Sequence, residues 1–332
     1  MRALRSAPLF LLLAAVSCAT SRAGTTSTPE GAAGSPQPAG PAKAAAAEGP
    51  RAILWEVTRP GAPERPLYLT GSIHVGKPDQ FPFPPSLDAA FARSTALVVE
   101  LDPGALDLHE AQRLSVRLGL AKSPAQFLSK TIDAETRSLL PAALQRVGLT
   151  PEAVEPMRAW FVAVSLSVLE LQKAGFSAKD GIDNVLLARA RGHKQIVELE
   201  TVESQLTALA GLPDEVQALM LRDTIRTAPL TPGILARVAA AWEGGDAEAI
   251  AAVVLESASD PRFAPIYEAL FTVRNKAMTA RLARLIDEPG THFVVVGVGH
   301  VVGPEGIAAL LARRGFLVRQ LGREARVAAA PP

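Results

Sequence analysis

Two histidines that follow similar short segments are the residues of this chain best suited to chemistry. An apolar run leads through Gly71 to His74, and a second run, residues 292–296, leads through Gly297 to His300. Each glycine lets the backbone turn sharply, three residues before the histidine. Open α/β folds bind ligands beyond the carboxyl ends of their strands, so we expect both imidazoles at one edge of a sheet. Imidazole binds Zn, Mn, Fe or Co and also transfers protons near neutral pH.

Taken alone, either histidine would more often be a loop or capping residue. The matched spacing favours one shared site over two unrelated loops. His109, His193 and His292 have no such pattern and are expected to be solvated surface residues.

Carboxylates end two other apolar runs. Glu100 lies in the run 96–101, where a buried charge is costly unless it is paired or bound to a metal. The alternative is that Glu100 points outward and pairs with an arginine. Glu200 follows the run 194–199, and Glu198 shares its face because side chains alternate along a strand. Spacing alone therefore leaves open which of these two glutamates serves a site.

The segments around these residues predict an α/β fold with a central mixed, largely parallel sheet and flanking helices. Strands are expected at residues 53–57, 67–70, 96–101, 194–199, 292–296 and 316–320. Helices are expected at residues 86–94, with Ser86 as the N-cap, and at residues 265–286 and 304–315. Residues from about 107 to 255 are rich in Ala, Leu, Glu, Gln and Arg, which predicts a large helical insertion.

The first residues predict export from the cytoplasm. Residues 1–17 have the pattern of a signal peptide, in which two arginines precede an apolar run too short to span a bilayer. Cys18, the single cysteine of the chain, follows as in a bacterial lipobox, with Ala15 where leucine is usual. We therefore expect a lipid anchor at Cys18 that holds the protein in the cell envelope, on the periplasmic face of the outer membrane. The alternative is ordinary secretion, with Cys18 an incidental residue of the cleavage region.

Composition divides the rest of the chain into a predicted tether, a single domain and a tail. Residues 18–50 consist mainly of Ala, Gly, Pro, Ser and Thr, which cannot bury a core, so we expect a disordered tether. Residues 51–323 are expected to form a single domain and residues 324–332 a disordered tail. A formal net charge of +1 and 5% aromatic residues argue against nucleic acid as a partner, so none is expected.

Six separated motifs resemble the TraB/GumN family, which is related to the Tiki proteases. They cover residues 69–74, 98–102, 181–183, 199–206, 274–275 and 297–303, within a resemblance that runs from about Trp55 to Leu321. Glu198 stands where the family pattern has glycine.

This resemblance implies an α/β fold akin to the erythromycin-esterase and ChaN haem-binding groups. For Tiki-like members it implies metal-dependent peptide hydrolysis that uses the two Gly-x-x-His segments and a glutamate. His74, His300 and Glu100 would then hold the ion, and the neighbours implied in the site are Glu200, Arg274 and Asn275.

The resulting hypothesis is a metal-dependent hydrolase. A divalent Mn, Co, Zn or Fe ion held by His74, His300 and Glu100 would keep a position open for water. Glu100 or Glu200 would take a proton from that water, and Arg274 would stabilise the developing oxyanion. The expected substrate is a peptide or another small molecule of the envelope. The alternative is a lipoprotein that binds haem or a metal without catalysis, and the sequence leaves the oligomeric state open.

Overall fold

The computed structural model describes residues 50–327 of the 332-residue chain. The predicted signal peptide, Cys18, residues 18–49 of the predicted tether and the last residues of the predicted tail lie outside the described residues. Within residues 50–327, no helix combines the length and the apolar character that a membrane crossing requires.

A six-stranded sheet forms the centre of the described chain, in the order β4-β3-β5-β2-β1-β6. Its strands are β1 (Arg51–Arg59), β2 (Ala62–Ser72), β3 (Ala96–Val99), β4 (Gln195–Glu198), β5 (His292–Gly297) and β6 (Leu317–Gly322). β4, β3, β5 and β2 are parallel neighbours, whereas β1 is antiparallel to both β2 and β6. The sheet is therefore mixed and mostly parallel, as the sequence predicts.

Residue types explain the place of each strand. β3 and β5 are buried along their whole length, as continuous apolar runs in a parallel sheet should be. β4 is only half-buried and lies at one edge. β1 and β2 form a hairpin whose turn contains Gly61, with a φ of +84° that suits glycine.

Helices make up most of the remaining described chain. They are α1 (Pro85–Arg93), α2 (Leu108–Gly119), α3 (Leu128–Thr131), α4 (Ala134–Arg146), α5 (Pro151–Val154), α6 (Ala159–Lys173), α7 (Ile182–Ala190), α8 (Val202–Ala210), α9 (Asp214–Thr227), α10 (Thr231–Glu243), α11 (Ala247–Val254), α12 (Ala264–Tyr267), α13 (Val273–Leu285), α14 (Val298–Val301) and α15 (Ile307–Arg313). The predicted helical insertion is thus present, interrupted by the predicted strand β4.

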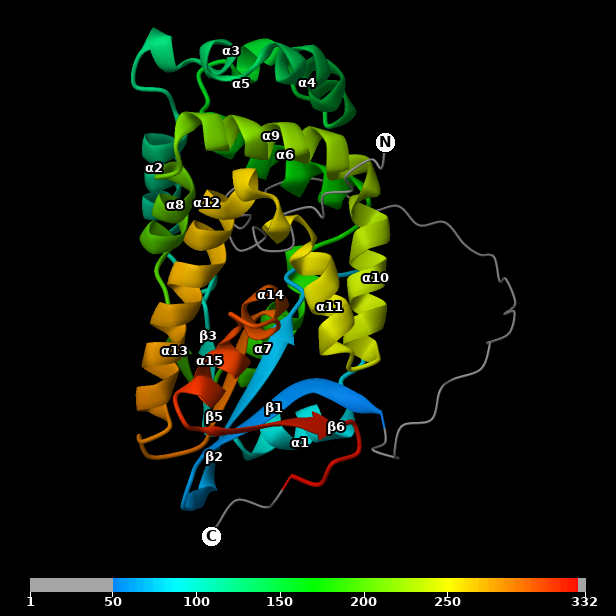
Figure 1. Ribbon diagram of the computed structural model, residues 1–332, viewed down its shortest axis with the longest axis vertical. Coiled ribbons are helices and arrows are strands. Elements are labelled where there is room, and N and C mark those ends of the chain that lie inside the picture. Colours follow the sequence, from blue (N-terminus) through cyan, green and yellow to red (C-terminus); the bar gives the residue numbers. More distant parts are fainter. Residues whose placement is uncertain (1–49, 328–332) are drawn as a thin grey trace, which may run out of the picture.

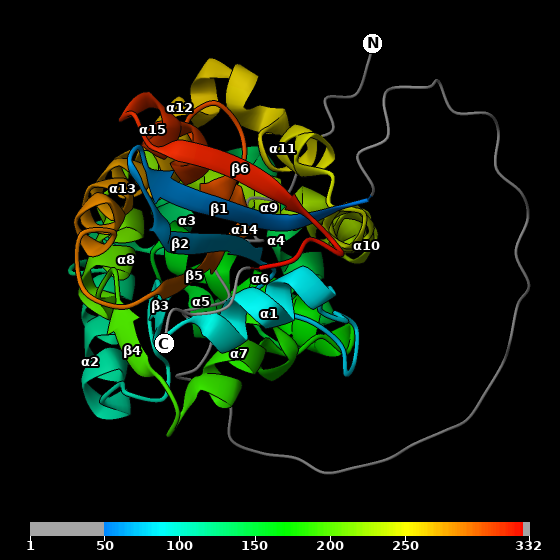
Figure 2. The ribbon, with the colours of Figure 1, turned by 90° about the horizontal axis from the view of Figure 1, so that it is seen from below.

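Most of the helical insertion lies beyond one end of the sheet, whereas α7 packs beside β3 and β4 (Figure 1). Helices α3–α6 and α9 form a layer at one end of the molecule, with α10 and α11 along one side and α8 and α13 along the other. Figure 2 shows α1 beneath the sheet, where Phe91 packs edge-to-face on Phe293 of β5 at 5.4 Å between ring centroids. The carboxyl ends of the central strands therefore point toward the helical insertion.

Four local predictions differ from the structure. His292 is not a solvated surface residue, because it starts the buried strand β5 and is 6% exposed. Ser86 is not the N-cap of α1, because Pro84 holds that position and Ser86 is buried in the first turn. The predicted helix 265–286 contains a π-helical turn, Glu268–Thr272, between α12 and α13. His300 lies in the short helix α14 and not in an open turn.

Candidate functional site

His74, Glu100 and His300 meet where three neighbouring strands end. They follow β2, β3 and β5, which lie side by side in the sheet. The Nε2 atom of His74 lies 3.7 Å from Oε1 of Glu100, and the Nε2 atom of His300 lies 3.9 Å from Oε2 of the same carboxylate. Both imidazoles therefore face one glutamate, although 226 residues separate them along the chain (300 − 74).

A carboxylate fixes the orientation of His74. Nδ1 of His74 lies 3.1 Å from Oδ2 of Asp183, and Oδ1 of Asp183 accepts a hydrogen bond of 2.6 Å from the Ser72 hydroxyl. Asp183 is at the start of α7, which the backbone hydrogen bond from Ile182 N–H to the carbonyl oxygen of Ile73 ties to the segment before His74. An ionised carboxylate only accepts hydrogen bonds, so Nδ1 of His74 carries a proton.

An amide fixes His300 in the same way. Nδ1 of His300 lies 2.6 Å from Oδ1 of Asn275, whose Nδ2 donates to the carbonyl oxygen of Glu305 at 2.8 Å. Because the Asn275 nitrogen is committed to a carbonyl, its oxygen must face the imidazole and accept the Nδ1 proton. Neutral His300 therefore presents an Nε2 lone pair to Glu100.

The two Nε2 atoms are the unusual feature of the site. His74 is 4% exposed and His300 is 0% exposed, and neither Nε2 atom has a hydrogen-bond partner among residues 50–327. A buried polar atom without a partner costs free energy, so native proteins seldom leave one unexplained. An electron-pair acceptor placed between the two imidazoles would remove that cost once both imidazoles are neutral.

Arg274 links the site glutamate to a second one. Its guanidinium donates to Oε2 of Glu100 at 2.7 Å and to both carboxylate oxygens of Glu200, at 2.8 and 2.5 Å. Gln205 donates to Oε2 of Glu200 at 3.0 Å, and the Gly297 N–H donates to Oε1 of Glu100 at 2.5 Å. Glu200 is therefore used to hold Arg274, and Arg274 in turn holds Glu100.

The surroundings of the two histidines shift their pKa values in opposite directions. Burial alone would lower the pKa of His74, but the carboxylates of Asp183 and Glu100 together outweigh burial and raise it to about 9. Burial and the Arg274 guanidinium lower the pKa of His300 to about 3. Burial alone would raise the pKa of Glu100, but His300, Arg274 and His74 hold it below its ordinary value. The site thus keeps an anionic carboxylate between one basic and one weakly basic imidazole.

The donors at this site suit a metal only in part. Within residues 50–327, no three His, Cys, Asp or Glu side chains form a ready-made metal-binding group. The His74 and His300 nitrogens fit as donors because they are buried, converging and without partners. Glu100 already holds Arg274 and Gly297. With both imidazoles neutral, three carboxylates (Glu100, Glu200 and Asp183) against one guanidinium would leave two negative charges, which a divalent cation would balance. The metal stays a prediction.

Glu198 lies apart from this group. Its carboxylate accepts a 2.7 Å hydrogen bond from the backbone N–H of Asp102, just beyond β3. Glu200, two residues later, contacts Arg274. The structure therefore separates the two glutamates that spacing alone could not.

Gly71 and Gly297 are glycines for a different reason from the one expected. Neither has a positive φ, and Gly71 lies within β2 and not at a turn. A Cβ on Gly71 would lie 2.8 Å from the Cα of Val298, and one on Gly297 would lie 2.6 Å from Nε2 of His74. Close approach, rather than freedom to turn, requires glycine at both positions.

Three contributing residues were not predicted as part of the site. Asp183 and Gln205 lie inside two of the quoted motifs, which were the available signal. Trp242 of α10 carries no such signal, yet its Nε1–H donates to the carbonyl oxygen of Gly71 at 2.7 Å. The π-helical turn just before Arg274 and Asn275 was also missed, and such turns frequently occur at functional sites.

A family model and two relatives match the chain. A model of the TraB/PrgY/gumN family matches residues 53–320. The protein YbaP of Escherichia coli (strain K12), named as uncharacterized, is 30% identical over 258 residues, which is 77% of this chain and 90% of YbaP. An uncharacterized protein of Treponema pallidum (strain Nichols) is 22% identical over 276 residues, which is 80% of this chain and 81% of that protein. No solved structure matches the chain.

Proposed function

Because the chain belongs to the TraB/PrgY/gumN family, we propose that it is a metal-dependent hydrolase that acts on peptides or other small substrates of the cell envelope. The relatives named above carry no stated activity, so the site itself must support the proposal. One observation carries it. Two buried imidazoles are held through Nδ1, and both direct toward the same carboxylate an Nε2 atom that has no hydrogen-bond partner in the described part of the chain.

The first role of these residues would be to hold a divalent ion. His74 and His300 would supply Nε2, with Asp183 and Asn275 fixing the imidazoles from behind, an arrangement typical of metal-ligating histidines. Glu100 would complete the ligand set. The ion, when bound, would act as a Lewis acid and lower the pKa of water.

The remaining residues would handle protons and charge. Glu100 would receive the proton of the attacking water, since it is anionic and central. Arg274 would stabilise negative charge that develops on the substrate oxygen. Glu200 would keep Arg274 in place and is therefore a positioning residue in this proposal.

Haem binding is the weaker alternative. Each Nε2 atom lies within 4 Å of Glu100, at 3.7 and 3.9 Å, so the carboxylate occupies the space in which a macrocycle between the imidazoles would lie. The erythromycin-esterase/ChaN-like arrangement of the fold and the envelope location remain parts of the proposal.

Metal analysis of paired variants tests the function. His74→Ala and His300→Ala should each lose the bound ion and metal-stimulated peptide hydrolysis while keeping the wild-type circular dichroism spectrum. The double variant should be little worse than either single one, because residues that act as a unit are strongly non-additive. His193→Ala, in an exposed loop, is the matched control and should behave as wild type.

Two results would count against the proposal. Full metal content in either single variant would show that the two histidines do not bind one shared ion. A Soret band on haem addition, lost in both variants, would favour the haem-binding alternative.

A further inference from the structure

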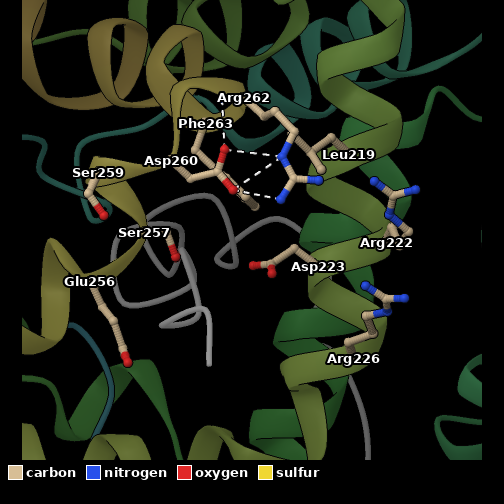
Figure 3. Close-up of a pocket in the computed structure, with 10 residues that line it drawn as sticks. All are labelled: Leu219, Arg222, Asp223, Arg226, Glu256, Ser257, Ser259, Asp260, Arg262 and Phe263. Carbon is tan, nitrogen blue, oxygen red and sulfur yellow. Dashed lines mark hydrogen bonds and ion pairs between the residues drawn. The ribbon is translucent and has the colours of Figure 1, made fainter. Parts of the chain in front are cut away.

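A pocket of about 100 Å³ with polar walls lies between α9 and the 3-10 turns that follow α11 (Figure 3). Its polar groups are engaged within the protein. Arg262 donates several hydrogen bonds to Asp260, the shortest of 2.6 Å. Asp223 has a partner as well, and the Ser257 hydroxyl interacts with Tyr267. These groups therefore need no ligand, and the contact that bears on the proposed site comes from the next helix, α10.

Trp242, near the end of α10, contacts the chain on both sides of His74. Its Nε1–H donates to the carbonyl oxygen of Gly71, which precedes the histidine, at 2.7 Å. Its ring meets the rings of Phe81 and Phe83, which follow the histidine, at 5.9 and 6.4 Å between centroids. Trp242 is 2% exposed, so water does not compete for its N–H. One buried side chain thus holds the His74 segment at two places.

The hydrogen bond to Gly71 lies where β1 stops pairing with β2. The last residue of β2 paired with β1 is Thr70, opposite Leu54. The Thr70 hydroxyl donates to the carbonyl oxygen of Ile53 at 2.5 Å, whereas β5 continues to pair with β2 as far as Ser72. The Trp242 indole therefore supplies a donor to β2 one residue beyond its last pair with β1.

Gly71 is also a point at which the two histidine segments touch. A Cβ on Gly71 would lie 2.8 Å from the Cα of Val298, the first residue of α14, which contains His300. A shift of Gly71 would therefore change how closely β2 approaches α14. For this reason the hydrogen bond from Trp242 bears on the separation of His74 and His300.

The turn after α10 is attached to the sheet, which holds Trp242 in place. Nε2 of Gln320 in β6 donates to the carbonyl oxygens of Ala52 in β1, at 2.8 Å, and of Gly245, at 2.9 Å. The Gly245 N–H donates to the carbonyl oxygen of Trp242 at 3.1 Å. The indole therefore projects from an anchored turn and can support the His74 segment instead of following it.

We propose that Trp242 is a positioning residue of the proposed active site, which fixes the end of β2 through its indole N–H and so sets where His74 faces His300. The role of the two histidines as metal ligands rests on the proposed function. Their placement by Trp242 can be measured separately, because the imidazoles report it without metal or turnover.

Two tryptophan variants isolate the hydrogen bond. Trp242→Phe removes the N–H and keeps an aromatic ring for Phe81 and Phe83. Trp160→Phe is the matched control, because Trp160 of α6 is 0% exposed and its Nε1 has no hydrogen-bond partner among residues 50–327. Both variants remove a buried indole, but only Trp242→Phe removes a hydrogen bond to β2. Each should keep the wild-type circular dichroism spectrum.

NMR of the full chain with ¹⁵N-labelled histidine, in EDTA and at one pH, measures the placement. The chain has five histidines, so single His→Ala variants assign the imidazole signals. Trp242→Phe should shift the signals of His74 and leave those of His193, in an exposed loop, unchanged. Trp160→Phe should leave all five histidines at their wild-type signals.

Titration with Zn²⁺ provides a second measurement. Trp242→Phe should bind Zn²⁺ about three- to tenfold more weakly than wild type, as the loss of one hydrogen bond predicts. Trp160→Phe should match the wild type. Gln320→Leu releases the turn after α10 from a half-buried position, so it should shift the same His74 signals and provides the test if Trp242→Phe does not fold.

Wild-type His74 signals in Trp242→Phe, or in Gln320→Leu where it is needed, would overturn the proposal. Equal shifts in Trp160→Phe would do the same. Shifted His74 signals in Trp242→Phe, together with a wild type that binds no Zn²⁺, would support the positioning role and count against the hydrolase. Metal-stimulated hydrolysis with unchanged His74 signals in Trp242→Phe would support the hydrolase and remove the role of Trp242.

Discussion

At the residue scale, Glu198 and Glu200 have different contacts and should respond differently to the same substitution. Glu200→Gln removes the charge that holds Arg274, so turnover of a metal-loaded enzyme should fall at least about tenfold. Glu198→Gln weakens one hydrogen bond to the backbone of Asp102, which should lower the free energy of unfolding by about 1 kcal/mol. Steady-state kinetics and urea unfolding measure the two effects, and each variant is the control for the other.

Equal losses of turnover in both variants would show that the separation of the two carboxylates does not matter for activity. Restored turnover in Glu200→Asp would support a charge role for Glu200, because aspartate keeps the charge that Arg274 needs.

The sequence indicates single residues well when their position on a strand determines their place. His74, Glu100 and His300 follow apolar runs, and the ends of parallel strands meet at one edge, so their proximity could be predicted. Asp183 could not be placed, because its contact with His74 depends on how α7 packs against a segment 109 residues earlier (183 − 74). Hydrogen-bond partners that come from a helical insertion have no local pattern in the sequence.

At the element scale, the glycine that ends β5 sets the space around the histidines. Gly297→Ala keeps an allowed backbone, with φ at −49°, but places a Cβ 2.6 Å from Nε2 of His74. Metal affinity should fall at least about tenfold, and the overpacking should cost about 1–3 kcal/mol of stability. Metal titration and urea unfolding check both expectations.

Two other glycines provide the comparison. Gly71→Ala would bring a Cβ 2.8 Å from the Cα of Val298, a main-chain atom, so its expected effect is a loss of stability. A Cβ on Gly233 in α10 would meet no atom of residues 50–327 within 4 Å, so Gly233→Ala should stabilise the fold by about 0.5–1 kcal/mol. Unchanged metal affinity in Gly297→Ala would mean that the ion does not lie beside His74.

Element types were predicted more reliably than their interruptions. The strands and the helical insertion follow from apolar runs and composition. The π-helical turn Glu268–Thr272 has no Pro or Gly to mark it, yet Arg274 and Asn275 follow it almost directly. The short helix α14 was not predicted either, because the segment that contains Gly297 and Gly299 resembles a loop in sequence.

At the scale of the whole molecule, acid should destabilise the fold partly through His292. This residue starts β5, is 6% exposed, and has its pKa lowered by burial, with Glu288 acting in the opposite direction. In the unfolded chain His292 takes up a proton near pH 6.5, whereas in the folded chain it does so only at lower pH. The free energy of unfolding therefore falls as the pH drops below about 6.5, by at most about 1.4 kcal/mol per pH unit. His292→Gln should make the free energy of unfolding less dependent on pH between 7.5 and 5.5 in urea titrations.

His193→Gln, in an exposed loop, is the matched control and should keep the wild-type pH dependence. His292 lies at the opposite end of β5 from His300, so its contribution should be independent of the site. An identical pH slope in His292→Gln and wild type would contradict this expectation.

The proposed anchor is a property of the whole chain and depends on Cys18, outside the described residues. Cys18→Ser should move the protein from the membrane pellet to the soluble envelope fraction, because the acylated thiol is the expected attachment point. Fractionation followed by a carbonate wash measures the distribution. A variant that remains in the washed pellet would show that something other than Cys18 holds the protein there.

The order of strands in the sheet has a consequence for synthesis and export. β5 lies between β3 and β2, yet it is made long after both, once the helical insertion has been completed. Until residues 292–300 are made, β2 and β3 keep unpaired edges and the histidine pair is incomplete. Contacts between residues so distant in sequence form slowly, which would keep a nascent chain unfolded for the export that the first residues predict. A copy truncated before β5 would have exposed strand edges, prone to pair with other chains, and no His300, so a complete chain is required both for solubility and for the proposed site.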